Sequence, residues 1–153
     1  MDSWDTAAKV SSAKSRFAKN QILFGKLRPY FHKVGIAPIS GICSTDIVVV
    51  DAINEFDRAL ICSVCSSKEF VDYNTQASSG TRMPRTKWKV MGEYPIAMGN
   101  EAVRIAYSEL VTPMHEKIQH SILENQTLAK IRDYLLPRLM SGEVRISATD
   151  EAA

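Results

Sequence analysis

TPMHEKIQHSILENQTLAKIRDYLLPRLMSG, the stretch from Thr112 to Gly142, decides the fold of the C-terminal part of the chain. Its apolar residues recur every three or four positions, which is the spacing of one face of an α-helix. Thr112 and Pro113 are typical of an N-cap and of the first helical position. Pro137 should end or kink this helix, and Gly142 should close it.

A broad apolar stripe runs along the predicted helix between residues 114 and 136, a length of about 35 Å at about 1.5 Å per residue. Asn125 interrupts the stripe, and a polar residue in such a seam can fix the register of two paired helices. Two interpretations stay open: the helix packs back on its own domain, or it pairs with another helix. The candidate subunit-interface residues are Met114, Ile118, Ile122, Asn125, Leu128, Ile131 and Leu135.

Upstream of this region the hydrophobic pattern alternates between strand and helix. Ile47 to Val50 are four β-branched residues in a row, which predicts a strand covered on both faces. The apolar residues between 53 and 62 fall at helical spacing, and Ser66 with Glu69 resembles a capping box that starts a second helix. Further strands are predicted at 21–24, 30–34, 88–94 and 144–146, and a loop is predicted at 77–84.

These elements predict an α+β globular domain of mixed sheet and helices, followed by a long C-terminal helical arm. From residue 100 onward the chain is expected to be helical. The expected boundaries are 1–97 for the domain, 98–146 for the arm and 147–153 for a flexible tail. The hydrophobic content of 45% is sufficient for a core of its own.

The net charge of +2 conceals a strong segregation of the basic residues. The span from Thr6 to Thr45 holds seven Lys and Arg residues and no acid, and a second acid-free span from Tyr73 to Gly92 holds four more. Such runs create a local positive field. Either run alone is typical of a solvated basic face. The two runs together leave two interpretations open, a solvated face and a surface that binds a polyanionic partner.

Motifs of common enzymes are not found in the sequence. It contains no G-x-x-x-x-G-K-[S/T] and no H-E-x-x-H, and its three histidines stand apart. Cys62 and Cys65 form a C-x-x-C that fits a thiol or zinc site, yet a second ligand pair is lacking, so structural cysteines are expected. The first twenty residues hold no signal-peptide run, and no stretch would span a bilayer, so we expect a cytoplasmic protein.

Several stretches nevertheless occur in a characteristic order. They are ILFGKLRPY at 22–30, GICSTD at 41–46, SGTRMPR at 79–85, EYPI at 93–96 and NQTLAKIRDYLLPRLMSGE at 125–143. Over residues 16–146 this series resembles the specificity subunit of type I restriction–modification systems. The ending LLPRLMSG carries most of the likeness.

The resemblance implies a non-catalytic, cofactor-free subunit that reads double-stranded DNA. Residues 16–97 resemble the later part of one target-recognition domain, and residues 100–140 resemble one conserved spacer helix. The implied partners are the modification (methyltransferase) subunits and the restriction subunit. Self-pairing through the arm, from Met114 to Leu136, is a separate hypothesis. The family has two recognition domains and this chain has one, so a half-subunit, a C-terminal fragment and a decayed product are alternatives. Residues 98–101 and Gln21 also depart from the family pattern.

Two basic segments are the predicted DNA-binding surface. Their Lys and Arg side chains would contact phosphates or guanine edges, and their hydroxyl groups would contact phosphates. The alternative is a helical adaptor whose basic face binds an acidic protein. The predicted DNA-binding residues are Lys26, Arg28, Lys33, Ser79, Thr81, Arg82, Arg85 and Lys87.

Overall fold

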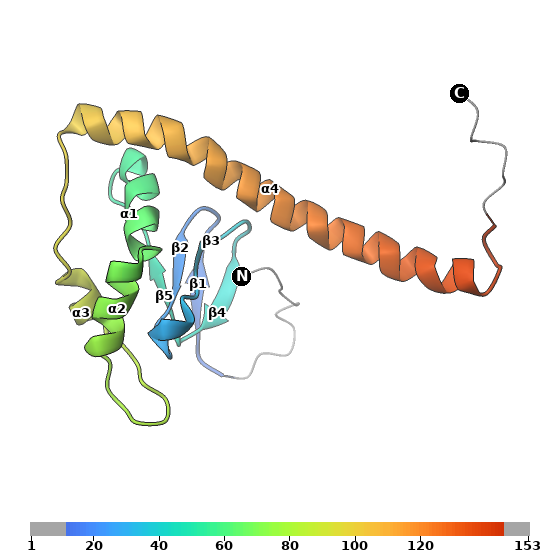
Figure 1. Cartoon of the computed structure of the whole chain (residues 1–153), viewed down its shortest axis with the longest axis horizontal. Helices are drawn as coiled ribbons and strands as arrows, with labels where there is room; N and C mark the ends of the chain where they lie inside the picture. The colour runs from blue at the N-terminus through green and yellow to red at the C-terminus, as the bar shows by residue number, and fades with distance from the viewer. Residues whose placement is uncertain (1–11, 146–153) are drawn as a thin grey trace.

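The computed structural model describes residues 12–145 and shows an α+β domain from which a long helix extends (Figure 1). This is the predicted fold class. The domain holds two small antiparallel sheets. One pairs β1 (Lys14–Phe17) with β4 (Gly41–Ser44), and the other has the order β3 (Val34–Ile36), β2 (Ile22–Gly25), β5 (Ile47–Val50).

The three-stranded sheet is built around β2, whose four residues are all buried. Leu23 pairs with Gly35 of β3 on one side and with Val49 of β5 on the other. The predicted strand at Ile47–Val50 is confirmed, but the expectation that it is covered on both faces is wrong. It lies at the edge of the sheet, and its first three residues are only partly buried, because the shorter apolar run in β2 takes the central place.

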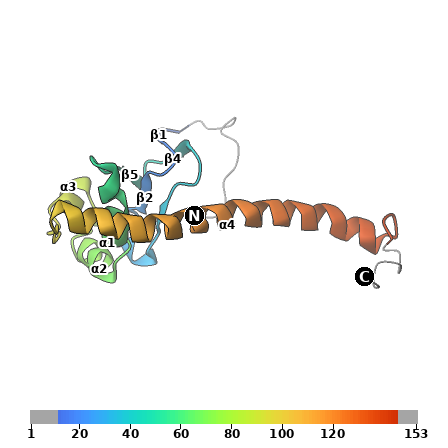
Figure 2. The ribbon, with the colours of Figure 1, turned by 90° about the horizontal axis from the view of Figure 1, so that it is seen from above.

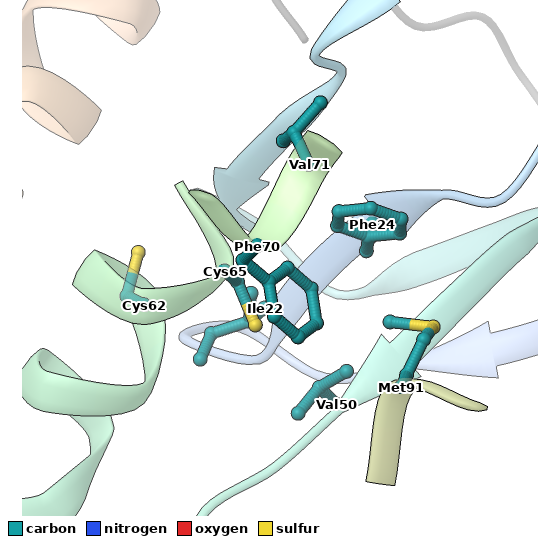
Figure 3. Close-up of a cluster of buried hydrophobic side chains, with 8 residues drawn as sticks. All are labelled: Ile22, Phe24, Val50, Cys62, Cys65, Phe70, Val71 and Met91. Atoms are coloured by element: carbon teal, nitrogen blue, oxygen red, sulfur yellow. The ribbon is translucent and has the colours of Figure 1, made fainter. Parts of the chain in front are cut away.

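Short helices cover this sheet and complete the core. They are η2 (Pro29–Phe31), η3 (Glu55–Asp57), α1 (Arg58–Cys65), α2 (Lys68–Gln76) and α3 (Trp88–Gly92). Figure 3 shows side chains of β2, β5 and the three α-helices meeting in one cluster. The ring of Phe70 is at the centre, with its edge contacts to Phe24 and Tyr94 at 5.5 and 5.0 Å between centroids.

The two cysteines of the C-x-x-C are part of this core, as the structural interpretation expected. Cys62 and Cys65 are each 5% exposed, and both thiols are free. Burial raises the pKa of Cys65 to about 12, so its thiolate is scarce at neutral pH. A reactive thiol pair is therefore not what these residues form.

Several predicted elements differ from those observed. Residues 30–34 do not form a strand, since η2 occupies the first part and β3 begins only at Val34. The predicted strand at 88–94 is wrong: residues 88–92 form α3, which places Met91 in the core, and residues 93 and 94 follow it as a turn. The second helix is capped by Ser67 and not Ser66, and the Ser67 hydroxyl accepts from Phe70 N–H. Strands β1 and β4 were not predicted.

The arm is one continuous helix, α4 (Glu101–Met140), about 60 Å long at about 1.5 Å per residue. The predicted start at Thr112 and Pro113 is wrong. Asn100 is the N-cap, and its side-chain oxygen accepts from Val103 N–H at 2.9 Å. Pro113 lies inside the helix, where bonds to the domain on either side hold neighbouring turns in place.

The C-terminal end of α4 also differs in detail from expectation. Pro137 neither ends nor interrupts the helix, which continues to Met140. Gly142, with a φ of 76°, follows the helix end in the left-handed conformation that favours glycine. Val144 and Arg145 are not in a strand, and residue 146 lies outside the described residues. Within the described part of the chain, no helix combines the length and apolar character that crossing a bilayer requires.

Candidate nucleic-acid interface

The loop that joins α2 to α3, residues 77–87, lies at the end of the domain remote from α4 (Figure 1). It folds back on itself, because Ser79 and Arg85 exchange both backbone hydrogen bonds at 3.1 and 3.0 Å. Gly80 has a φ of 106°, and a Cβ there would lie 3.3 Å from the Met83 carbonyl oxygen. The close turn therefore depends on glycine.

This loop is joined to the chain segment that follows β2. The Arg28 N–H donates to the Pro84 carbonyl at 2.7 Å, and Arg28 Nη2 donates to the Arg82 carbonyl at 3.1 Å. The Thr86 N–H donates to the Lys26 carbonyl, and its buried hydroxyl donates to Asn74 in α2. Residues more than fifty positions apart thus form one continuous surface. We call the eight predicted DNA-binding residues on these two segments the basic surface.

Arg85 is held by an acidic partner that the sequence did not indicate. Its Nε lies 2.8 Å from Asp46 Oδ1, and its Nη2 lies 3.2 Å from Asp46 Oδ2. The hydrogen bond and charge of Arg85 lower the pKa of Asp46. No local sequence pattern indicates that Asp46 and Arg85, 39 positions apart, form an ion pair. The only link in the sequence is that both residues belong to the ordered series of motifs. Arg85 therefore braces the loop with much of its charge neutralised.

Other members of the basic surface are unengaged. The side chains of Arg82 and Lys87 are exposed and have no partner among residues 12–145. Ser79 and Thr81 are exposed beside Arg82. These side chains can reach an external polyanion without first breaking an ion pair. Lys26 and Arg28 are half-buried and therefore less accessible than Arg82 and Lys87.

The turn formed by η2 places two aromatic rings on the same surface, and sequence reasoning did not single them out. Tyr30 and Phe31 are about half exposed, with ring centroids 4.9 Å apart. Lys33 Nζ lies 5.4 Å and Arg28 Cζ 6.0 Å from the centroid of Phe31. The turn thus presents apolar rings between cations.

The first half of α4 is fixed to the domain by polar contacts. Arg104 pairs with the buried carboxylate of Asp57 at 2.7 and 2.8 Å. Tyr107 donates its hydroxyl to Ser63, 2.8 Å away. Buried Gln119 donates to the Ala37 carbonyl at 3.0 Å and to Asn20 Oδ1 at 3.2 Å. Ile122 and Leu123 still line grooves against the domain, and the rest of α4 projects away from it (Figures 1 and 2).

The predicted subunit-interface residues therefore fall into two groups. Ile118 and Ile122 help to line a groove of about 290 Å³ between α4 and β3, so they face the domain at least in part. The more distal members are exposed on the free half of the helix, and Met114 and Ile118 are exposed on the anchored half although Ile118 lines the groove. The exposed members are Met114, Ile118, Asn125, Leu128, Ile131 and Leu135. The first interpretation, packing on the chain's own domain, thus holds for the first half of α4, and pairing of the free half with another helix stays a prediction.

Among residues 12–145 no three His, Cys, Asp or Glu side chains gather as a metal ion would require. The polar cluster that stands out is the basic surface, which offers cations and hydroxyl groups. Such an arrangement can bind anionic oxygens and base edges.

Comparisons with known proteins point in the same direction. No protein-family model matches the chain. The specificity subunit of the type I restriction enzyme EcoDI from Escherichia coli is 33% identical over 87 residues, which are 57% of this chain and 19% of that protein. The specificity subunit of the type I restriction enzyme MjaIX from Methanocaldococcus jannaschii is 28% identical over 116 residues, which are 74% of this chain and 26% of that protein.

The aligned regions thus span about a fifth to a quarter of the length of these two relatives. The resemblance drawn from the order of the sequence motifs is confirmed, and it applies to a part of the relatives. This chain is similar to a portion of the specificity subunits of type I restriction enzymes.

Proposed function

We propose that the protein is a sequence-specific DNA-recognition subunit, or half-subunit, of a type I restriction–modification complex. It would select the site on double-stranded DNA while partner subunits methylate or cleave. The observation that carries this proposal is the similarity to two specificity subunits. The basic surface supports it, because the loop at 77–87 lies at the end of the domain away from α4 and its cations Arg82 and Lys87 are exposed to a large ligand.

Within the basic surface the residues would have different tasks. Arg82 is exposed and unpaired among the described residues, so we assign it to direct contact with a base edge or phosphate. Arg85 is engaged with Asp46 and would position the loop. Ser79, Thr81 and Lys87 would bind the phosphate backbone, which supplies affinity without sequence preference.

The free half of α4 would bind the partner subunits. Leu128, Ile131 and Leu135 repeat at helical spacing and are 55%, 48% and 37% exposed. Apolar side chains on a projecting helix suit a helix-to-helix interface. We propose that this stripe docks on the modification subunits, or on a second copy of the chain that supplies another recognition domain.

The proposal is tested by titrating double-stranded DNA with the full chain at several salt concentrations. About five phosphate contacts predict a slope of log affinity against log salt near −4.5. Replacing Arg82 and Lys87 by Gln should make the slope shallower by about 0.9 for each phosphate that the variant no longer neutralises. Lys130→Gln with Arg132→Gln removes the same charge from the free half of α4 and should leave the slope unchanged.

A salt-independent titration would contradict the proposal. So would a case in which the two double variants weaken binding equally, because only general charge would then matter. If the protein ignores DNA but binds acidic polypeptides through Arg82, the adaptor interpretation is correct instead.

A further inference from the structure

The turn at residues 28–33 has a shape that its own packing does not explain. Tyr30 and Phe31 are 50% and 52% exposed, although each ring would gain from burial. They contact one another at 4.9 Å between centroids with their planes tilted by 55°. Together they form one apolar projection from an otherwise cationic surface.

This projection is held on a strained and braced backbone. Arg28 and His32, on either side of η2, have φ values of 51° and 52°, a left-handed conformation that is strained for a residue with a side chain. His32 Nε2 donates to the Ser66 carbonyl at 2.8 Å, and the Arg28 N–H donates to Pro84. Strain of this kind persists where the surrounding contacts fix the geometry, and it is concentrated at functional sites.

The charges around the rings identify the kind of ligand. Lys33 Nζ and Arg28 Cζ lie 5.4 and 6.0 Å from the centroid of the Phe31 ring. Arg82 lies in the adjoining loop, and its carbonyl accepts a hydrogen bond from Arg28 Nη2. An apolar protein partner would bury the rings and leave these cations unpaired. A duplex instead offers stacked, apolar base faces between two rows of phosphates, which matches apolar rings between cations.

We propose that Tyr30 and Phe31 form a wedge that enters a groove of the DNA and partly unstacks one base step. This inference rests on the proposed function and adds an element to it. Arg28 and Lys33 would hold the phosphates that flank the opened step, while Arg82 contacts the neighbouring base pair. Apolar wedges favour steps that unstack easily, above all TA and CA/TG, and disfavour stiff A-tracts.

The test uses two short DNA duplexes of equal length and base composition, one of alternating TA steps and one of A-tracts. The full chain should bind the alternating duplex about tenfold more tightly, because its steps open at lower cost. The double variant Tyr30→Ala with Phe31→Ala should lose this preference and keep the salt slope of the wild type. End-to-end energy transfer should show a bend in the alternating duplex with the wild type alone.

Two control variants separate the wedge from general effects. Trp88→Ala removes another exposed aromatic ring of the same domain and should retain the preference. The exchange Tyr30→Phe with Phe31→Tyr keeps both rings and should also retain it. Circular dichroism and thermal unfolding should match for all variants, because the altered side chains are half exposed.

The outcomes separate this inference from the proposed function. If the wild type binds neither duplex, the proposed function fails, and the wedge fails with it. If the wild type binds DNA and the Tyr30→Ala, Phe31→Ala variant keeps the preference, only the wedge is wrong. Equal weakening on both duplexes would also overturn it, because the rings would then contact DNA without opening a step.

Discussion

Gly80 allows the loop at residues 77–87 to close on itself. Its φ of 106° is accessible to glycine and strained for other residues, and a Cβ would lie 3.3 Å from the Met83 carbonyl. The turn brings Ser79 opposite Arg85 and leaves Arg82 at the exposed tip. A single residue without a side chain thus determines how the most accessible cation of the basic surface is presented.

Gly80→Ala should lower the free energy of unfolding by about 1–2 kcal/mol, because alanine cannot adopt this φ without strain. It should also weaken DNA binding, because the Ser79–Arg85 pairing opens. Urea unfolding and DNA titration measure the two effects. Gly92→Ala is the matched control, since nothing lies within 4 Å of its Cβ position and alanine suits a helix. Equal effects of the two variants would contradict this role of Gly80.

The sequence predicted single residues unevenly, for a physical reason. Gly142 and the buried Cys62 and Cys65 were interpreted correctly, because a helix-ending glycine and a free buried cysteine depend on local chemistry. Asp46 was missed as a partner of Arg85, since an ion pair across 39 positions depends on how the chain folds back. The alternation over residues 30–34 predicts a strand that includes Tyr30 and Phe31, because such a pattern does not indicate a braced turn.

At the scale of elements, the ion pair between Arg104 and Asp57 fixes the start of α4 to η3. The Asp57 side chain is 7% and the Arg104 side chain 17% exposed, so both charges are largely removed from water. Arg104 also lies over the Phe56 ring at 5.2 Å. The attachment of the arm therefore depends on a buried pair, in which each charge needs the other.

Asp57→Ala should lower the free energy of unfolding by about 3–5 kcal/mol, because it leaves the Arg104 charge buried without a partner. Chemical denaturation measures the change, and hydrogen exchange should show α4 loosened at residues 101–108. Asp72→Ala, which breaks an exposed pair with Lys68, serves as the control and should change stability little. If both variants behave alike, the pair does not hold the arm.

Element boundaries were predicted well where local signals agreed with packing. Ile47–Val50 formed a strand and 77–84 a loop, since β-branching and turn residues act locally. Pro113 gave a strong start signal that the structure overrides, because the contacts of Tyr107 and Gln119 keep one helix running through it. Residues 88–92 form a helix instead of the predicted strand, because Met91 fills the core from that turn.

At the scale of the whole molecule, the protein separates two surfaces. The basic surface lies at one end of the domain, and the exposed apolar stripe lies on the far half of α4 (Figures 1 and 2). The stripe lies on the part of α4 beyond Gln119. In the proposed function, the residues that bind DNA are therefore separate from those that bind a partner subunit. Replacing residues of one surface should therefore spare the other.

The full chain should self-associate through this stripe in the absence of a partner subunit. Sedimentation well above micromolar concentration should show a dimer, and Leu128→Lys with Leu135→Lys should give a monomer, since charges are costly in an apolar helix pair. This variant should still bind DNA with an affinity that depends on salt concentration, because its substitutions lie outside the basic surface. Lys130→Glu with Arg132→Glu, on exposed positions beside the stripe, is the control. A wild-type monomer would leave docking on the modification subunits as the stripe's proposed use.

The unbroken course of α4 has a mechanical consequence. Gln119 bonds to the domain, and the helix continues from there to Met140, about 31 Å further at about 1.5 Å per residue. A tilt of about 10° at the anchor would move the tip by about 5 Å, which is nearly one helical turn. The free half of the helix thus acts as a lever that pivots where α4 is anchored to the domain. A small adjustment of the domain on its ligand would be amplified into a displacement that a partner at the tip can sense.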